Sequence, residues 1–155
     1  MKIICVGLNY RKHAAEMGRP LPEEPMVFLK PDSALLKKNK PFFIPDFSKN
    51  LQYEAEVVLR ISKLGKGIAA RYAHRYFDAL TVGIDFTARD LQHKFSQAGH
   101  PWELSKTFDG SAPVGTFLPV EKFSNTKDIG FTLEVNGETR QEGNTSDLIF
   151  SFADI

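Results

Sequence analysis

Leu51-Gln-Tyr-Glu-Ala-Glu-Val-Val-Leu-Arg-Ile61 is the strongest strand pattern in the chain. Apolar and β-branched residues surround its two acids, and Gly65 and Gly67 follow its end, which is typical of a bounded β-strand. Because successive side chains of a strand point to opposite faces, Glu54 and Glu56 share one face, roughly 6–7 Å apart. The pattern therefore predicts two neighbouring carboxylates on one face of a sheet.

Two carboxylates at this separation repel one another unless a positive charge lies between them. Asp85, in the stretch Gly83-Ile-Asp-Phe-Thr-Ala-Arg-Asp-Leu-Gln92, supplies a third acid from another element. Three such carboxylates suit a hard divalent cation, with Mg²⁺ as the first candidate. The alternative is the solvated outer face of an edge strand, because acids are usually exposed.

The rest of the chain predicts short strands, few helices and much loop. Further strands are expected at residues 2–6, 26–30 and 80–86, with shorter strand pieces around 42–44. Helices are expected at 9–17, 69–78 and 88–97, and a helix-compatible run begins at 147. Asn136-Gly137, between strands expected at 129–135 and 138–142, predicts a hairpin with a type I′ turn.

Composition excludes several classes of protein. The 155 residues are enough for one domain with a core, and a net charge of +1 gives no electrostatic reason to expect nucleic acid as a partner. The single cysteine, Cys5, cannot form an intrachain disulfide, so a reducing cytoplasm is the expected compartment. No apolar run approaches the ~20 residues that a membrane span needs, and no signal peptide is expected.

His13 and Glu16 are spaced for contact on a helix. Residues three apart face the same way, so the carboxylate can orient and polarise the imidazole. A histidine held in this manner is suited to deprotonating water as a general base. The alternative is an exposed ion pair on the helix surface, which is common at this spacing.

Four further side chains are candidates for ligand contacts. Lys106 lies in a loop-rich stretch and Lys30 directly before a proline; either could be a solvated charge or the anchor of a developing oxyanion. Arg89 and Gln92 follow Asp85 closely, so they could reach a ligand of the metal, and Arg89 suits bidentate binding of a carboxylate. The alternative for Arg89 is the exposed first turn of a helix.

Other chemistry is not indicated. The sequence has no Gly-rich phosphate loop, no C-x-x-C pair and no G-x-S-x-G motif. Cys5 lies in an apolar run and is expected to be a buried strand residue. The remaining histidines lack metal-ligand spacing and are expected to be structural or surface residues: His74, His93 and His100.

Several motifs follow one another in a specific order along the chain. They are Gly7-Leu-Asn-Tyr10 with His13 and Glu16, Phe28-Leu-Lys-Pro31, Tyr53-Glu-Ala-Glu56, Gly83–Gln92, Lys106-Thr-Phe-Asp109, Val135-Asn-Gly137 and Asn144-Thr-Ser-Asp147. Taken together, these motifs resemble the fumarylacetoacetate hydrolase family. The likeness covers essentially the whole chain and is closest to the small single-domain members that act on acylpyruvates and oxaloacetate.

The resemblance implies a fold and a set of residue roles. The expected fold is α+β and mostly β, a mixed β-sheet roll with few short helices, in a protein that is usually a homodimer. Mg²⁺ or Mn²⁺ would be bound by Glu54, Glu56 and Asp85. His13 and Glu16 would be catalytic on a mobile lid at residues 9–25, and Lys106 would be catalytic beside the ligand. Substrate would be bound by Lys30, Arg89 and Gln92.

The chain departs from the family pattern at its end. Family members normally continue past the hairpin through a helix and a Gly/Thr/Pro-rich loop, whereas this sequence stops at Ile155, inside the expected helix. We therefore expect residues 1–155 to form a single catalytic domain that is incomplete at its C-terminus.

The leading hypothesis is a Mg²⁺-dependent hydrolase that cleaves a C–C bond in acylpyruvate-type 2-oxo acids. The same metal site would also serve an oxaloacetate decarboxylase or an isomerase or tautomerase of unsaturated dioates, and the residues do not choose among them. An alternative of another class is a non-catalytic metal- or ligand-binding β domain. The His13–Glu16 pair distinguishes the enzyme from the non-catalytic domain, because a structural domain has no use for it. The expected partner is a small 2-oxo acid, with no nucleic acid and no membrane.

Overall fold

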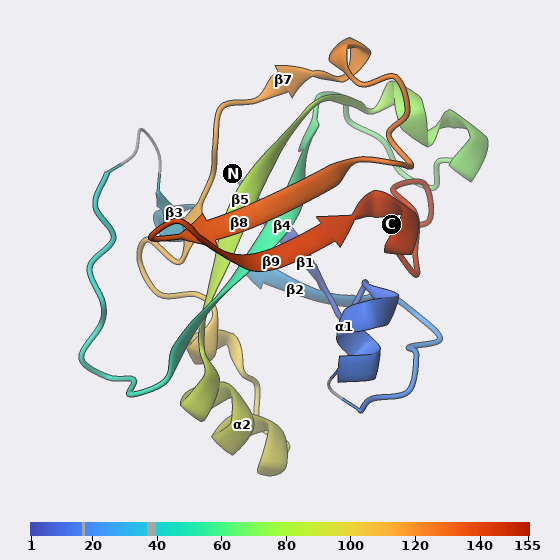
Figure 1. The fold of residues 1–155 in the computed structure, drawn as a ribbon. Coiled ribbons are helices and arrows are strands. Elements are labelled where there is room, and N and C mark those ends of the chain that lie inside the picture. Colours follow the sequence, from blue (N-terminus) through green and yellow to red (C-terminus); the bar gives the residue numbers. More distant parts are fainter. Residues whose placement is uncertain (17, 37–39) are drawn as a thin grey trace. The chain divides into compact units, whose positions relative to one another are not determined.

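The computed structural model describes residues 1–16, 18–36 and 40–155, and strands predominate in it (Figure 1). The strands are β1 (Ile3–Gly7), β2 (Met26–Lys30), β3 (Leu35–Leu36), β4 (Leu51–Ile61), β5 (Phe77–Ala88), β6 (Ala112–Pro113), β7 (Leu118–Pro119), β8 (Gly130–Val135) and β9 (Glu138–Asn144). The α-helices are α1 (Arg11–Glu16) and α2 (Arg89–Gln97). Short 3₁₀ helices are η1 (Asp32–Ala34), η2 (Ala70–Arg75), η3 (Glu103–Ser105), η4 (Val120–Lys122) and η5 (Thr145–Asp147).

The chain divides into two compact units. The first unit comprises Met1–Cys5, Phe28–Glu56 and Val82–Thr116, and the second comprises Val6–Val27, Val57–Thr81 and Phe117–Ile155. The long strands β4 and β5 contribute residues to both units. Both parallel and antiparallel pairs occur, so the expectation of a mostly β fold with mixed pairing is confirmed.

In the first unit, β5 is hydrogen-bonded to β4, and residues 111–115 run along it as well. The Phe86 N–H donates to the Ser111 carbonyl at 3.0 Å, and the Gly115 N–H donates to the Val82 carbonyl at 3.0 Å. Small buried residues on these segments allow a close approach: Ala55, Ala88 and Ala112. This packing brings the segment around Ser111 beside the C-terminal half of β5.

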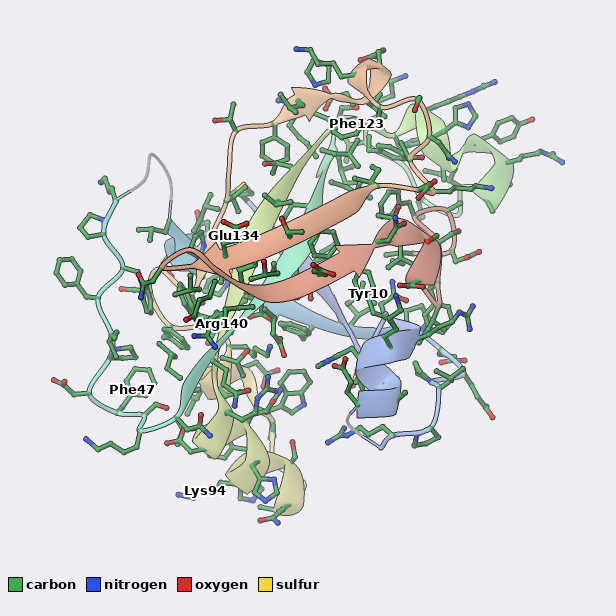
Figure 2. The ribbon with its side chains drawn as sticks, viewed as in Figure 1. Tyr10, Phe47, Lys94, Phe123, Glu134 and Arg140 are labelled. Carbon is green, nitrogen blue, oxygen red and sulfur yellow. The ribbon has the colours of Figure 1, made fainter. Side chains whose placement is uncertain are left out.

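Aromatic rings fix the loop that precedes β4. The Phe42 ring stacks on Phe86 with centroids 4.0 Å apart, and Phe47 (Figure 2) meets Phe108 edge-on at 5.5 Å. The strand expected around residues 42–44 is absent. Pro41 and Pro45 flank this segment, and a proline has no N–H to donate to a strand ladder.

The second unit is built around the hairpin of β8 and β9. The pairing runs from Gly130↔Asn144 to Val135↔Glu138, and both turn residues have positive φ, 55° at Asn136 and 81° at Gly137. Positive φ at both central residues is the requirement of a type I′ turn, as the sequence predicted. Figure 2 shows Glu134 and Arg140 on the two strands of this hairpin.

The start of α1 is attached to the C-terminal segment of the same unit. The Asn9 side chain donates to the Phe150 carbonyl at 3.0 Å and accepts from the Phe150 N–H at 2.8 Å. Tyr10 (Figure 2) forms a bridge with Leu148 and packs edge-on against Phe131 of β8, with ring centroids 6.0 Å apart. Two segments far apart in sequence therefore hold α1 in place.

Two helix predictions are wrong in this unit. Residues 69–78 form only the 3₁₀ turn η2 before β5 begins at Phe77, because burial of Phe77, Ala79 and Leu80 in the sheet overrides helix propensity. The run from residue 147 forms the end of η5 and then turns. Elsewhere the expected helices 9–17 and 88–97 correspond to α1 and α2, although Met17 lies outside the described residues. None of the described helices is long and apolar enough to cross a membrane.

Candidate active site

The first unit gathers several of the predicted site residues into one charged cluster. Glu54 and Glu56 lie on β4, Asp85 lies on β5, and Lys30 ends β2. Lys106 follows η3 directly. All five belong to the first unit, so strand pairing and one loop bring together acids and ammonium groups from distant parts of the sequence.

The ammonium of Lys106 lies between two of the acids. Its Nζ is 3.0 Å from Glu54 Oε2 and 2.5 Å from Asp85 Oδ2. The side chain is only 4% exposed, and Nζ lies over the Phe28 ring, 5.4 Å from the centroid. Lys106 therefore compensates the charges of Glu54 and Asp85, whereas it forms no ion pair with Glu56.

The ammonium of Lys30 is enclosed by protein oxygens. Nζ lies 2.9 Å from Asp85 Oδ1 and 3.0 Å from Ser111 Oγ, and it donates to the Ser111 carbonyl at 3.2 Å. It also donates to the carbonyls of Lys106 and Phe86. The side chain is 1% exposed. Burial lowers the pKa of Lys30, and the neighbouring Asp85 opposes that effect.

Asp85 is a central acceptor with one incompletely used oxygen. Its Oδ2 accepts from Lys106, whereas Oδ1 is buried without a well-aligned hydrogen bond, although Lys30 Nζ lies at 2.9 Å. The Lys30 contact with Oδ1 is therefore a charge contact whose direction is poor for a hydrogen bond. A buried oxygen of this kind has acceptor capacity for a cation.

Arg89 connects the start of α2 to β4. Its guanidinium donates to Glu54 Oε1 at 2.6 Å, to Gln52 Oε1 at 2.8 Å and to Gln92 Oε1 at 2.5 Å. The Arg89 N–H also donates to the Asn50 carbonyl at 2.8 Å, which ties the first turn of the helix to the entry of β4. Arg89 and Gln92 thus lie beside the acids, as expected.

The acids differ in their protonation. Burial raises the pKa of Glu54, but the charges of Lys106 and Arg89 together outweigh burial and hold the pKa below its ordinary value. Burial, followed by repulsion from Glu54 and Asp85, raises the pKa of Glu56 to about 8. None of the ion pairs among the described residues includes Glu56. Glu56 is therefore the acid that lacks a compensating charge.

The carboxylates of the cluster are chemically suited to bind a divalent cation, but in this structure two of them contact lysine ammonium groups. Carboxylate oxygens are the ligands that Mg²⁺ and Mn²⁺ prefer, and burial, followed by repulsion from Glu54 and Asp85, raises the pKa of Glu56. Within residues 1–16, 18–36 and 40–155, no group of three or more His, Cys, Asp or Glu side chains is arranged to hold a metal ion. The Lys106 ammonium occupies the position of a cation between Glu54 and Asp85.

His13 and Glu16 belong to the second unit. His13 Nδ1 lies 3.7 Å from Glu16 Oε2 on α1, with the side chains 42% and 74% exposed. The contact expected from the spacing is present, and its catalytic role stays a prediction. Lys12 on the same helix pairs with Asp147 at 2.9 Å. Mobility of a lid at residues 9–25 also stays a prediction.

Sequence reasoning missed several residues of the cluster. Phe28 faces Lys106, and Trp102 packs on Phe28 with ring centroids 5.1 Å apart. The signal for Phe28 was its position two residues before Lys30 on a strand, which places both side chains on one face. Nothing local in the sequence distinguishes Ser111, whose hydroxyl accepts from Lys30 and donates to the Lys106 carbonyl.

Comparison with known proteins identifies the family of this chain and several relatives. The family described as Fumarylacetoacetate (FAA) hydrolase C-terminal matches residues 2–155. The mitochondrial oxaloacetate tautomerase fahd-1 of Caenorhabditis elegans is 40% identical over 149 residues, which are 96% of this chain and 70% of the relative.

Two solved structures are similar over 99% of the chain. One is a putative fumarylacetoacetate hydrolase family protein from Yersinia pestis, at a TM-score of 0.93 and 39% identity, covering 70% of that chain. The other is fumarylpyruvate hydrolase from Pseudomonas aeruginosa in complex with Mn²⁺ and pyruvate, at a TM-score of 0.92 and 36% identity, covering 68% of that chain.

Proposed function

The chain belongs to the fumarylacetoacetate hydrolase family, and on this premise we propose that it is a divalent-cation-dependent enzyme that enolises a small 2-oxo acid, with oxaloacetate as the first candidate substrate. The observation that carries this proposal is the Lys106 ammonium held between Glu54 and Asp85. The first unit holds together the groups that keto–enol conversion needs. These groups are acids that can bind a cation, an ammonium group that can stabilise an oxyanion, and an arginine that can bind a substrate carboxylate.

The metal-binding residues proposed are Glu54, Glu56 and Asp85, with Mg²⁺ or Mn²⁺ as the ion. When bound, the ion supplies Lewis acidity toward the 2-oxo group. Mn²⁺ is present in the Pseudomonas aeruginosa fumarylpyruvate hydrolase structure, which supports a divalent cation of this type. When Glu56 is ionised, such an ion would supply the counter-charge that the ion pairs of the cluster do not give it.

Lys106 is proposed to move the proton. Its ammonium donates a proton to the 2-oxo oxygen of oxaloacetate, and the amine that remains takes a proton from C3. The ammonium is thereby restored, and the substrate is neither oxidised nor cleaved. Burial of Lys106 excludes water from this exchange and strengthens its interaction with developing negative charge.

Arg89 and Gln92 are proposed to orient the substrate. A guanidinium has five N–H donors, and the contacts to Gln52, Glu54 and Gln92 leave N–H groups for a substrate carboxylate. Because oxaloacetate carries two carboxylates, one can approach the cation while the other approaches Arg89. The name of the Caenorhabditis elegans relative, an oxaloacetate tautomerase, supports this choice of substrate.

Hydrolysis of acylpyruvates is the second candidate, and the His13–Glu16 contact favours it. Hydrolysis needs an activated water in addition to enolate stabilisation, and a histidine held by a carboxylate is suited to that task. The similarity to a fumarylpyruvate hydrolase supports the same reaction. In this scheme His13 takes a proton from water, the water oxygen attacks the distal carbonyl, and the C–C bond breaks to leave the enolate of pyruvate.

A two-substrate assay tests the proposal. The chain is freed of metal with EDTA, then loaded with Mg²⁺ or Mn²⁺. The enol–keto conversion of oxaloacetate is followed by ultraviolet absorbance, and pyruvate release from acetylpyruvate by a coupled dehydrogenase. We expect conversion of oxaloacetate only in the presence of metal. A metal-loaded chain that accelerates neither reaction would instead support the non-catalytic binding domain. Sedimentation velocity tests the proposed homodimer in the same samples.

A further inference from the structure

Two side chains on one face of β2 contact opposite ends of Lys106. Phe28 and Lys30 are two residues apart on the strand, so their side chains point the same way. The Phe28 ring faces the Lys106 ammonium, and the Lys30 ammonium donates to the Lys106 carbonyl. We propose that Phe28 and Lys30 are positioning residues that hold Lys106 in place for proton transfer, and that Lys30 is not a substrate ligand. This inference rests on the proposed function.

Phe28 defines one wall beside the Lys106 ammonium. The negative face of an aromatic ring attracts a cation, and the attraction is strongest when the cation is removed from water, as at Lys106. Trp102 packs on Phe28 at an interplanar angle of 51° and so supports the ring. The Trp102 carbonyl accepts from the Ser105 N–H at 3.0 Å and from Ser105 Oγ at 2.5 Å, which anchors Trp102 to the turn that carries Lys106.

Lys30 holds the backbone of Lys106 in place. Its ammonium contacts Asp85 Oδ1 and also the Lys106 and Ser111 carbonyls. The Ser111 hydroxyl links the two lysines, because it accepts a hydrogen bond from the Lys30 ammonium and donates one to the Lys106 carbonyl at 2.8 Å. A lysine has three N–H donors, and these protein oxygens exceed that number. No donor is left for a substrate, so Lys30 acts through Lys106 and Asp85.

The first test replaces Phe28. Phe28→Leu removes the ring face and keeps an apolar side chain, whereas Phe28→Tyr keeps the ring. Phe47→Leu is the matched control, because it loses an aromatic contact to Phe108 in the same unit without touching Lys106. With oxaloacetate and Mg²⁺, we expect Phe28→Leu to lower kcat about tenfold, which corresponds to about 1.4 kcal/mol of transition-state stabilisation. KM and Mg²⁺ affinity should stay at parent values, and Phe28→Tyr should restore kcat.

A spectroscopic measurement on the metal-free chain reads the position of Lys106 directly. The ε-methylene protons of a lysine whose ammonium lies over a ring are shifted upfield by the ring current. Lysine-selective ¹³C labelling with a Lys106→Arg assignment sample identifies the signal. We expect the upfield shift in the parent and in Phe28→Tyr, and its loss in Phe28→Leu. An unshifted parent signal, or a Phe28→Leu signal equal to that of the parent, overturns the role of Phe28.

Lys30→Met separates a positioning role from a substrate-binding role. A positioning role predicts a changed Lys106 signal together with a lowered kcat at the parent KM. A substrate ligand predicts a raised KM with Mg²⁺ affinity and the Lys106 signal unchanged, and that result overturns the inference. If Lys30→Met does not fold, Ser111→Ala removes the hydroxyl between Lys30 and the Lys106 carbonyl and takes its place in the same measurements. If the parent protein is inactive, the proposed function is wrong. The spectroscopic test still decides the position of Lys106, because it does not depend on activity.

Discussion

The ammonium of Lys106 lies 2.5 Å from Asp85 Oδ2, so a lysine and a divalent cation would compete for the same carboxylate. Glu54 is shared in the same way, at 3.0 Å from the ammonium. Glu54 and Asp85 are therefore charge-compensated without metal, and metal uptake requires the lysine to give up those contacts.

Replacement of Lys106 should uncouple metal binding from catalysis. Lys106→Met removes the competing ammonium, so Mg²⁺ affinity should rise by about tenfold or more, the equivalent of 1.4 kcal/mol per decade. Turnover of oxaloacetate should be lost, because the proton-transferring group is gone. Isothermal calorimetry and the absorbance assay measure the two effects. Lys122→Met, which removes an exposed lysine, is the control. Weaker Mg²⁺ binding in Lys106→Met would contradict the competition.

Substitution of Asp85 and substitution of Glu56 should differ in their effect on the unfolding free energy of the metal-free protein. Asp85→Asn leaves the buried ammonium groups of Lys30 and Lys106 with less compensation, and breaking a buried ion pair typically costs about 3–5 kcal/mol. Glu56→Gln removes an acid outside the ion pairs of the cluster, so unfolding free energy should hold or rise. Both variants should bind Mg²⁺ weakly. Urea unfolding in EDTA checks the difference, and equal losses of stability would contradict it.

Magnesium binding should release a proton from Glu56. Burial and neighbouring acids raise its pKa to about 8, so at pH 7 the metal-free side chain is mostly protonated. A metal ligand must be ionised, so binding releases about one proton per ion at that pH. Affinity should consequently rise with pH up to about 8 and then level off. Calorimetry in two buffers of different ionisation enthalpy measures the proton, and Glu56→Gln should abolish its release.

The His13–Glu16 pair should distinguish the two candidate reactions. His13→Ala removes the proposed general base, so acetylpyruvate cleavage should fall by roughly 10²–10⁴-fold. Mg²⁺ affinity should be unchanged and oxaloacetate enolisation should fall less, because neither depends on an activated water. His74→Ala, which removes an exposed histidine of the same unit, is the control. Equal losses in both reactions would assign the pair to a step that they share.

Residues 18–25 should exchange amide protons faster than the strands of the same unit. Pro20, Pro22 and Pro25 cannot donate to a ladder, and Gly18 has a φ of +60° that suits a turn. Hydrogen exchange detected by mass spectrometry measures the rates. Saturating pyruvate with Mg²⁺ should slow exchange in this segment if it closes over substrate. Rates equal to those of β8 and β9, with no response to ligand, would count against a lid.

Local chemistry in the sequence was sufficient to predict several elements. The strand β4, the hairpin at Asn136-Gly137 and the contact between His13 and Glu16 each depend on residues close together in the chain. Alternation along a strand, positive φ at two turn residues and the i,i+3 spacing of a helix are all short-range rules. The ordered motifs of the sequence likewise indicate the family.

Tertiary packing decided what the acids contact and which charge they carry. Lys30 meets the Lys106 carbonyl across 76 positions, and Lys106 meets Glu54 across 52, distances over which no periodic pattern extends. Tertiary burial also replaced the helix expected at 69–78 with the start of β5. The pKa of Glu56 depends on desolvation and on two acids placed by strand pairing. Sequence alone determined β4, the hairpin and the candidate site residues, whereas only the folded chain determined their partners and protonation, because burial and Coulomb energies depend on distances in space.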